Sequence, residues 1–342
     1  MAMNPLNGGN AGNESLFDLL GVPSVAEGAQ VTIADIHLQM REGILRAVDQ
    51  LSQSQQQTSD VFGYKWARRD TYDSPQTTAA TKAWLVERYG NAEEFGWLFD
   101  APGSVLLDAG CGSGVTALAL FGERLNRIRY LGADVSASID VAAARFRERG
   151  VSGAFLQCDL MRLPLPNESV HAILSEGVIH HTDSAERAFH QLARLLKLGG
   201  RFMFYVYRKK GPIREFVDDH LRDALHAVPP QEAWDALMPL SKLGKHLGEL
   251  GVTVNVPESI DLLEIPAGPI DLQRLFYWHI FKAYYRPELT LDEMNHINFD
   301  WYAPRNASRH TIEQVRAWCS QAGLSIERER VEEAGITIIA RK

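Results

Sequence analysis

The sequence predicts an α/β protein with a doubly wound, mostly parallel sheet. Between residues 104 and 207, short apolar runs alternate with helical patterns, and two strand-like runs close the chain at 325–331 and 336–341. Alternating strands and helices imply right-handed crossovers and a sheet that is covered on both faces. The 342 residues, of which 45% are hydrophobic, suit a folded protein of about two domains.

The N-terminal part is expected to form a helical cap. Residues 1–30 are rich in Gly and Asn and are predicted to be flexible. The apolar spacing over 33–51 predicts an amphipathic helix, followed by a Gln/Ser-rich linker at 52–59 and a second helix over 76–89. We therefore expect residues 31–100 to cap the sheet domain.

The sheet domain is predicted to cover residues 101–207 and 308–342. Its predicted strands are 105–108, 130–135, 154–159, 170–175 and 201–207, and its predicted helices are 116–123, 139–149 and 185–196. Residues 208–307, between its two parts, are helical and aromatic in pattern, without the alternation of strands. A last helix at 311–322, with Thr311 as its cap and Gly323 as its stop, precedes a closing antiparallel hairpin.

The turn after the first strand carries glycine at every second position, at Gly110, Gly112 and Gly114. Glycine permits positive φ and lets a ligand approach the backbone, and doubly wound sheets bind ligands at the carboxyl ends of their strands. The spacing differs from the G-x-G-x-x-G of dinucleotide folds, because the third glycine comes one residue earlier. A tight strand-to-helix turn without a ligand is the alternative interpretation.

Acidic residues end the next two predicted strands. Asp134 ends the second strand, where it could accept hydrogen bonds from two vicinal ribose hydroxyls. Asp159 ends the third strand, where a carboxylate could meet an adenine amino group. Each acid taken singly is more often a solvated turn residue or a helix cap. Together with Asp108, their shared register along one sheet edge favours a ligand site.

These residues resemble the class I S-adenosylmethionine (SAM)-dependent methyltransferases over residues 60–207 and 308–342. The resemblance also rests on the segments 158–160, 175–181 and 198–201. It implies a Rossmann-like sheet of seven strands with an antiparallel last strand, a methyltransferase activity and SAM as cofactor. The cofactor-binding residues it implies are Asp108, Gly110, Cys111, Gly112, Gly114, Asp134, Val135, Asp159, Leu160 and Ser175.

The aromatic segment 62–66 is similar to an entry segment that covers the cofactor in some members of this family. The resemblance therefore adds Tyr64 to the implied cofactor-binding residues. A hydrophobic patch that docks the N-terminal helix is the alternative interpretation of the same segment.

Methyl transfer from a sulfonium is an in-line displacement, so the protein mainly aligns the reacting atoms and excludes water. A base is needed only if the acceptor arrives protonated. The candidates are Glu176, His180 and His181, of which His181 is favoured because histidine titrates near neutral pH. The alternative is that these residues start a helix and bond to backbone or water. No further ligands complete a metal set around His180, His181 and Asp183, so no metal is predicted.

Residues 208–307 occupy the place where this family often inserts a substrate lid. The predicted substrate-binding residues are Tyr207, Arg208, Tyr277, Tyr284, Trp301, Arg305 and His310. The aromatic residues suit the wall of a pocket for a planar, hydrophobic or cationic substrate, and the packed core of a helix pair is the alternative. The basic residues at 208–210 and 214 could receive a carboxylate or phosphate, or form a solvated face.

The size of the insertion favours a small-molecule acceptor, such as one of specialised metabolism. The alternatives are methylation of a protein or another macromolecule, and a SAM-fold subunit without catalysis. The slot 175–178 lacks the Asn/Asp-Pro-Pro-aromatic motif of enzymes that methylate base amines, and the net charge is −8, so no nucleic-acid partner is expected. The lack of a long apolar run or signal peptide and the three scattered cysteines predict a cytoplasmic protein without a membrane span. A homodimer is left open.

Overall fold

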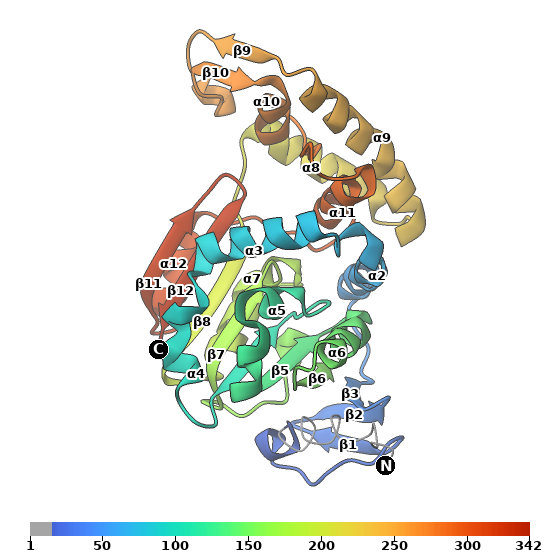
Figure 1. Ribbon diagram of the computed structural model, residues 1–342, viewed down its shortest axis with the longest axis vertical. Coiled ribbons are helices and arrows are strands. Elements are labelled where there is room, and N and C mark those ends of the chain that lie inside the picture. The colour runs from blue at the N-terminus through green and yellow to red at the C-terminus, as the bar shows by residue number, and fades with distance from the viewer. Residues whose placement is uncertain (1–15) are drawn as a thin grey trace.

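The structure is a computed structural model that describes residues 16–342; part of the segment predicted to be flexible, 1–15, lies outside the described residues. Figure 1 shows a central twisted sheet flanked by helices, with an elongated helical insertion extending from it. The strands of the main sheet are β1 (Gln30–Ile33), β2 (Ile36–Arg41), β3 (Ile44–Ala47), β4 (Val105–Ala109), β5 (Arg129–Asp134), β6 (Ala154–Gln157), β7 (Val170–Glu176), β8 (Leu196–Tyr207), β11 (Ser325–Val331) and β12 (Gly335–Arg341). The helices outside the insertion are α2 (Gln53–Ala67), α3 (Pro75–Tyr89), α4 (Gly96–Phe99), α5 (Val115–Phe121), α6 (Ser138–Glu148), α7 (Ala185–Ala193) and α12 (Ile312–Gln321).

The main sheet has ten strands in the order β1-β2-β3-β6-β5-β4-β7-β8-β12-β11. From β6 to β8 neighbouring strands are parallel, whereas β12 runs antiparallel to both β8 and β11. The α/β class, the doubly wound order and the antiparallel last strand are therefore confirmed. The three N-terminal strands extend the expected seven to ten, because β3 pairs in parallel with β6.

Apolar side chains on the two faces of the sheet form two cores. Successive residues of β4 point to opposite faces, so Leu107 packs in one core and Leu106 in the other. The first core includes Phe189 of α7 and Trp318 of α12, and the second includes Phe146 of α6. Helices on both faces leave the carboxyl ends of the strands as the open edge where a site can form.

The helix predicted over 33–51 is wrong, because this segment forms the strands β1, β2 and β3. Ile36, Leu38 and Met40 alternate with exposed or half-buried residues, which is the period of a strand. The turns between the strands place two consecutive residues each at positive φ, at 34–35 and 42–43. Such turns match the twist of a hairpin, and the Glu-Gly pair at 42–43 was the available signal.

Two other expectations for the N-terminal part also fail. The predicted linker at 52–59 belongs to α2, whose first turn is capped by the Ser52 side chain accepting from the Gln55 amide. Leu16, Phe17 and Leu20 are buried in the core of the sheet domain, so residues 16–30 are part of the fold. The helix predicted over 76–89 is confirmed as α3.

The insertion consists of α8 (Pro212–Leu225), α9 (Pro230–Glu249), α10 (Leu272–His279) and α11 (Leu291–Tyr302), with a hairpin of β9 (Thr253–Val256) and β10 (Gly268–Asp271). The hairpin departs from the expectation of a mostly helical insertion without strands. Helix α11 packs on α9 through buried polar contacts, in which Asn298 donates to Ser241 at 2.8 Å and Ser241 donates to Asn295 at 2.6 Å. Figure 1 shows α11 beside α2, so the insertion meets the N-terminal helices above the sheet.

Candidate active site

The glycine turn between β4 and α5 is shaped so that only glycine fits. Gly110, Gly112 and Gly114 have φ values of +84°, +52° and +75°. A Cβ on Gly110 would lie 2.1 Å from a methyl carbon of Val178, and a Cβ on Gly112 would lie 2.9 Å from Nε1 of Trp66. The missing side chains therefore let the backbone of the turn approach both its neighbours and a ligand.

Asp134, at the end of β5, holds the glycine turn in place. Its Oδ2 accepts a hydrogen bond from the Gly112 amide at 2.9 Å, and its Oδ1 accepts from the amide and hydroxyl of Ser136 at 2.8 and 2.7 Å. Asp159 caps the short turn after β6 by accepting from the Met161 amide at 2.9 Å. Both carboxylates line the same cavity as Gly110 and Gly112.

This cavity, of about 430 Å³, runs from the glycine turn to the insertion. Its cofactor end includes the predicted residues Gly110, Cys111, Gly112, Asp134, Val135, Asp159 and Leu160. The glycine cradle and the two acids at successive strand ends fit SAM, since they offer close backbone approach and hydrogen-bond acceptors for a nucleoside.

Four of the implied cofactor residues do not line the cavity. Asp108 lies beneath the turn, where Tyr130 donates to it at 2.8 Å and burial raises its pKa to about 7. Gly114 packs on Phe146, and Ser175 donates to the Ala109 carbonyl at 2.9 Å. Asp108, Gly114 and Ser175 therefore contact protein groups around the turn and do not line the cavity.

Tyr64 is the fourth implied cofactor residue that does not line the cavity, so its predicted role in cofactor binding is corrected. Its hydroxyl donates to Gln231 at 2.8 Å, and its ring packs against Trp234 and Phe299 of the insertion. Because the segment 62–66 lies on helix α2, its residues face different directions. Phe62 and Trp66 line the cavity instead.

The three catalytic candidates have different surroundings. His181 lines the cavity, with Nδ1 2.5 Å from the Asn306 carbonyl oxygen, Nε2 without a hydrogen-bond partner in the described structure, and a pKa that burial lowers to about 4. His180 does not line the cavity and packs on the Tyr207 ring with centroids 3.8 Å apart. Glu176 lines the cavity, and its Oε2 accepts from the Tyr89 hydroxyl. Burial raises the pKa of Glu176 to about 7, and its Oε1 has no partner within residues 16–342.

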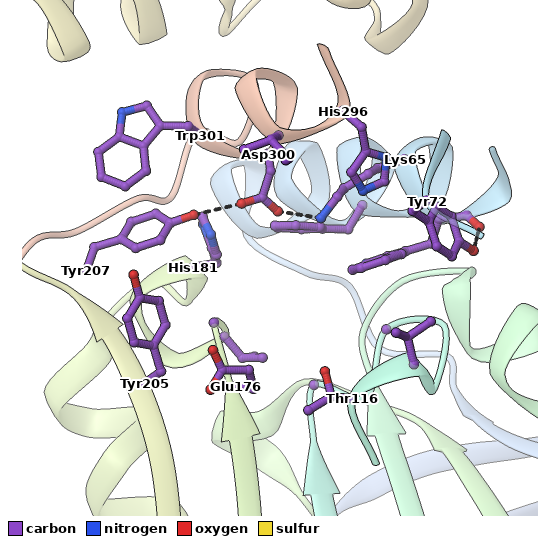
Figure 2. Close-up of a pocket in the computed structure, with 18 of the residues that line it drawn as sticks. Lys65, Tyr72, Thr116, Glu176, His181, Tyr205, Tyr207, His296, Asp300 and Trp301 are labelled. Carbon is purple, nitrogen blue, oxygen red and sulfur yellow. Dashed lines mark hydrogen bonds and ion pairs between the residues drawn. The ribbon is translucent and has the colours of Figure 1, made fainter. Parts of the chain in front are cut away.

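Sequence reasoning missed a charged cluster that joins the N-terminal helices, the sheet and the insertion. Lys65 of α2 lies 2.5 Å from Oδ1 of Asp300 on α11, and the Tyr207 hydroxyl of β8 donates to Oδ2 at 2.8 Å (Figure 2). Burial alone would raise the pKa of Asp300, but the positive charge of Lys65 outweighs it and holds that pKa well below its usual range. Lys65 and Asp300 are 235 positions apart, so spacing gave no signal.

The predicted substrate residues divide into two groups. Tyr207, Tyr277, Tyr284 and Trp301 line the cavity, as do Tyr205, Lys210, Arg214 and Lys282. Arg208, Arg305 and His310 do not, which corrects their assignment. Arg208 pairs with His310 in a strand-like bridge, the His310 ring contacts the Ser308 hydroxyl at 2.9 Å, and the Arg305 amide donates to Gln57 at 2.8 Å.

Comparison with known proteins identifies the sheet domain. Residues 107–204 match the family model described as "Methyltransferase domain". The chain is 34% identical over 153 residues to a bovine (Bos taurus) protein named "Probable tRNA methyltransferase 9B", which is 43% of this chain and 30% of the bovine protein. It is 32% identical over 145 residues to the Bacillus subtilis "Uncharacterized methyltransferase YcgJ", which is 40% of this chain and 56% of that protein.

A solved structure, the Burkholderia thailandensis 1,6-didemethyltoxoflavin-N1-methyltransferase, aligns with 93% of this chain and 99% of its own, at 16% identity and a TM-score of 0.43. The fold, the glycine turn and the family match define a class I methyltransferase domain. Residues 107–204 therefore belong to the methyltransferase domain family, and the glycine turn and strand-end acids of this domain fit SAM as its cofactor. The chain spans 30% of the bovine protein's length and 56% of the Bacillus protein's length.

Two findings on residues 16–342 bear on other expectations. None of the helices described there is long and apolar enough to cross a membrane. No group of three or more His, Cys, Asp or Glu side chains in that range could hold a metal ion. The cytoplasmic location and the homodimer stay predictions.

Proposed function

We propose that the chain transfers a methyl group from SAM to an acceptor that binds between β8 and helices α10 and α11. The observation that carries this proposal is one continuous cavity, lined at one end by the glycine turn, Asp134 and Asp159, and at the other by aromatic and charged side chains. When bound, SAM supplies a methyl group on a positively charged sulfur. The chain's own residues would hold it, exclude water and orient the acceptor.

We propose Glu176 as the group that accepts a proton from an acceptor that arrives protonated. A proton acceptor works best when its pKa lies near the operating pH. Glu176 is suited to this role because Oε1 has no partner in the described structure and burial brings its pKa to about 7. His181, which the sequence favoured, is the weaker base, because burial lowers its pKa to about 4.

The acceptor has two candidate classes. The aromatic end of the cavity, which includes Tyr205, Tyr277 and Trp301, supports a compact planar acceptor. The name of the bovine relative supports a tRNA acceptor, and among the relatives this macromolecular alternative has more support than the small-molecule expectation. The matched family model ends at residue 204, so it leaves out α10 and α11, which build the acceptor end.

A labelled-methyl assay separates these classes. The protein is incubated with SAM labelled in its methyl group, and with either a protein-free metabolite extract or total tRNA. Label in organic-extractable products supports the small acceptor, whereas label in tRNA that is released by ribonuclease supports the nucleic-acid acceptor. A protein pool is added as a third substrate. If label enters none of the three pools, the result would argue against catalysis.

Cofactor binding gives the first prediction. Asp134→Ala should weaken SAM binding by about 1–3 kcal/mol, because it removes the carboxylate that holds Gly112 and that we propose binds the ribose hydroxyls. Calorimetric titration with SAM and with its demethylated product, S-adenosylhomocysteine (SAH), measures the change. Asp235→Ala on α9 is the control, because Asp235 is exposed and its carboxylate accepts hydrogen bonds from Gln231. Equal affinities of wild type and Asp134→Ala would contradict the proposed cofactor site.

A further inference from the structure

The acceptor end of the cavity contains a buried lysine without a hydrogen-bond acceptor in the described structure. Lys282 follows α10, is 8% exposed and lines the cavity. Its Nζ lies over the ring of Trp301, 4.6 Å from the centroid. A ring face attracts a cation but does not replace the hydrogen bonds that an ammonium loses on leaving water.

The other cations that line the cavity have oxygen partners. Lys65 pairs with Asp300 at 2.5 Å, Lys210 donates to the Ala334 carbonyl at 3.0 Å, and Arg214 binds both oxygens of Asp218 at 3.2 Å. Arg286 lies 3.9 Å from Glu288. Lys282 thus differs from them all.

The nearby carboxylate of Asp300 is already engaged. One of its oxygens is bound by Lys65 and the other by the Tyr207 hydroxyl. Asp300 attracts Lys282 through space, yet burial outweighs this and lowers the pKa of Lys282 to about 7. An anion entering the cavity would supply the missing hydrogen bonds and favour the charged lysine.

Aromatic side chains line the cavity near Lys282. Trp301 lies under its ammonium, and Tyr277 and Tyr284 line the same end of the cavity. Aromatic walls favour planar ligands through stacked and edge-to-face contacts. We propose that Lys282 selects the acceptor by binding an anionic oxygen, such as a carboxylate, carried on a planar aromatic ring. This inference rests on the proposed function and names the substrate class of the same site.

The test compares two small probes that differ in one charge, 4-hydroxybenzoate and 4-hydroxybenzamide. Calorimetry measures the affinity of each for the SAH-loaded full chain. We expect the wild type to bind the carboxylate at least about tenfold more tightly than the amide, and Lys282→Met to bring that ratio close to one. Lys282→Arg should keep the preference, and Lys242→Met, which removes an exposed lysine on α9, should leave it unchanged.

The inference is overturned if the SAH-loaded wild type does not bind the carboxylate, binds both probes equally, or keeps its preference in Lys282→Met. SAH affinity is measured on every variant, because Lys282 lies at the acceptor end and its loss should not change cofactor binding. Unchanged SAH affinity in Lys282→Met also shows that the variant is folded. If the wild type does not bind SAH, the proposed function is refuted instead. Failure of the Lys282 inference and failure of the proposed function are therefore distinguishable.

Discussion

Glu176→Gln is expected to lower kcat/KM by about 10²–10⁴-fold at pH 7 while leaving SAH affinity close to that of the wild type. Glutamine keeps the shape of the side chain but cannot accept the proton of the acceptor. The carboxyl is suited to this role, since Glu176 lines the cavity, Tyr89 holds its Oε2, and its buried Oε1 has no partner in the described structure. The rate of SAH release, measured with whichever acceptor pool is labelled, gives the ratio.

The pH dependence provides an independent check. Glu176 is active as a base only when deprotonated, so kcat/KM of the wild type should rise with pH through about 7, and this rise should be absent in Glu176→Gln. The protonated form is favoured in the folded state, where burial raises the pKa from 4.5 to about 7. The free energy of unfolding should therefore fall for the wild type, relative to the glutamine variant, as pH rises across that window.

Glu186→Gln is the control, because Glu186 is exposed on α7 and should leave both profiles unchanged. Tyr89→Phe removes the donor to Oε2, so it should shift the pH at which the rate rises while retaining activity. A Glu176→Gln variant within about threefold of wild-type kcat/KM would rule out Glu176 as the base. The same loss in His181→Gln alone would restore His181 to that role.

The cofactor end could be predicted because its signals are local in sequence. Gly110, Gly112 and Asp134 are tied together by the ends of adjacent parallel strands, so a turn and a strand end suffice to place them. The prediction of Tyr64 as a cofactor-binding residue fails because the segment 62–66 is helical. Phe62 and Trp66 face the cavity, while Tyr64 faces the insertion.

Four aromatic residues predicted from the sequence line the acceptor end, but its charged cluster and Lys282 could not be predicted because long-range contacts place them. Lys65, Tyr207 and Asp300 come from α2, β8 and α11, and Lys282 from the segment after α10. No spacing rule connects them. The prediction for residues 33–51 failed for a different reason. Ile36, Leu38 and Met40 fit a helical pattern when the apolar residues beyond the turn at 42–43 are counted with them.

Asp300→Ala is expected to destabilise the protein by about 3 kcal/mol, because it leaves the Lys65 ammonium buried without its counter-charge. The Lys65 side chain is 5% exposed and that of Asp300 is 27% exposed, so the figure lies at the low end for a broken buried pair. Urea unfolding at pH 7 measures the loss. The variant also removes the contact that joins α2 and β8 to the insertion, so limited proteolysis should cut residues 208–307 faster.

Two further variants separate the buried charge from the hydrogen bonds. Tyr207→Phe removes a neutral donor to the Asp300 carboxylate but leaves both charges in place, and it should lower the unfolding free energy by about 1.5–3 kcal/mol. The double change Lys65→Met with Asp300→Leu removes both charges, so it should be less destabilising than Asp300→Ala alone. If the double variant is instead the less stable of the two, the stranded charge is not the cause. The hydrogen bonds and packing at Asp300 would then be what holds the insertion over the cavity.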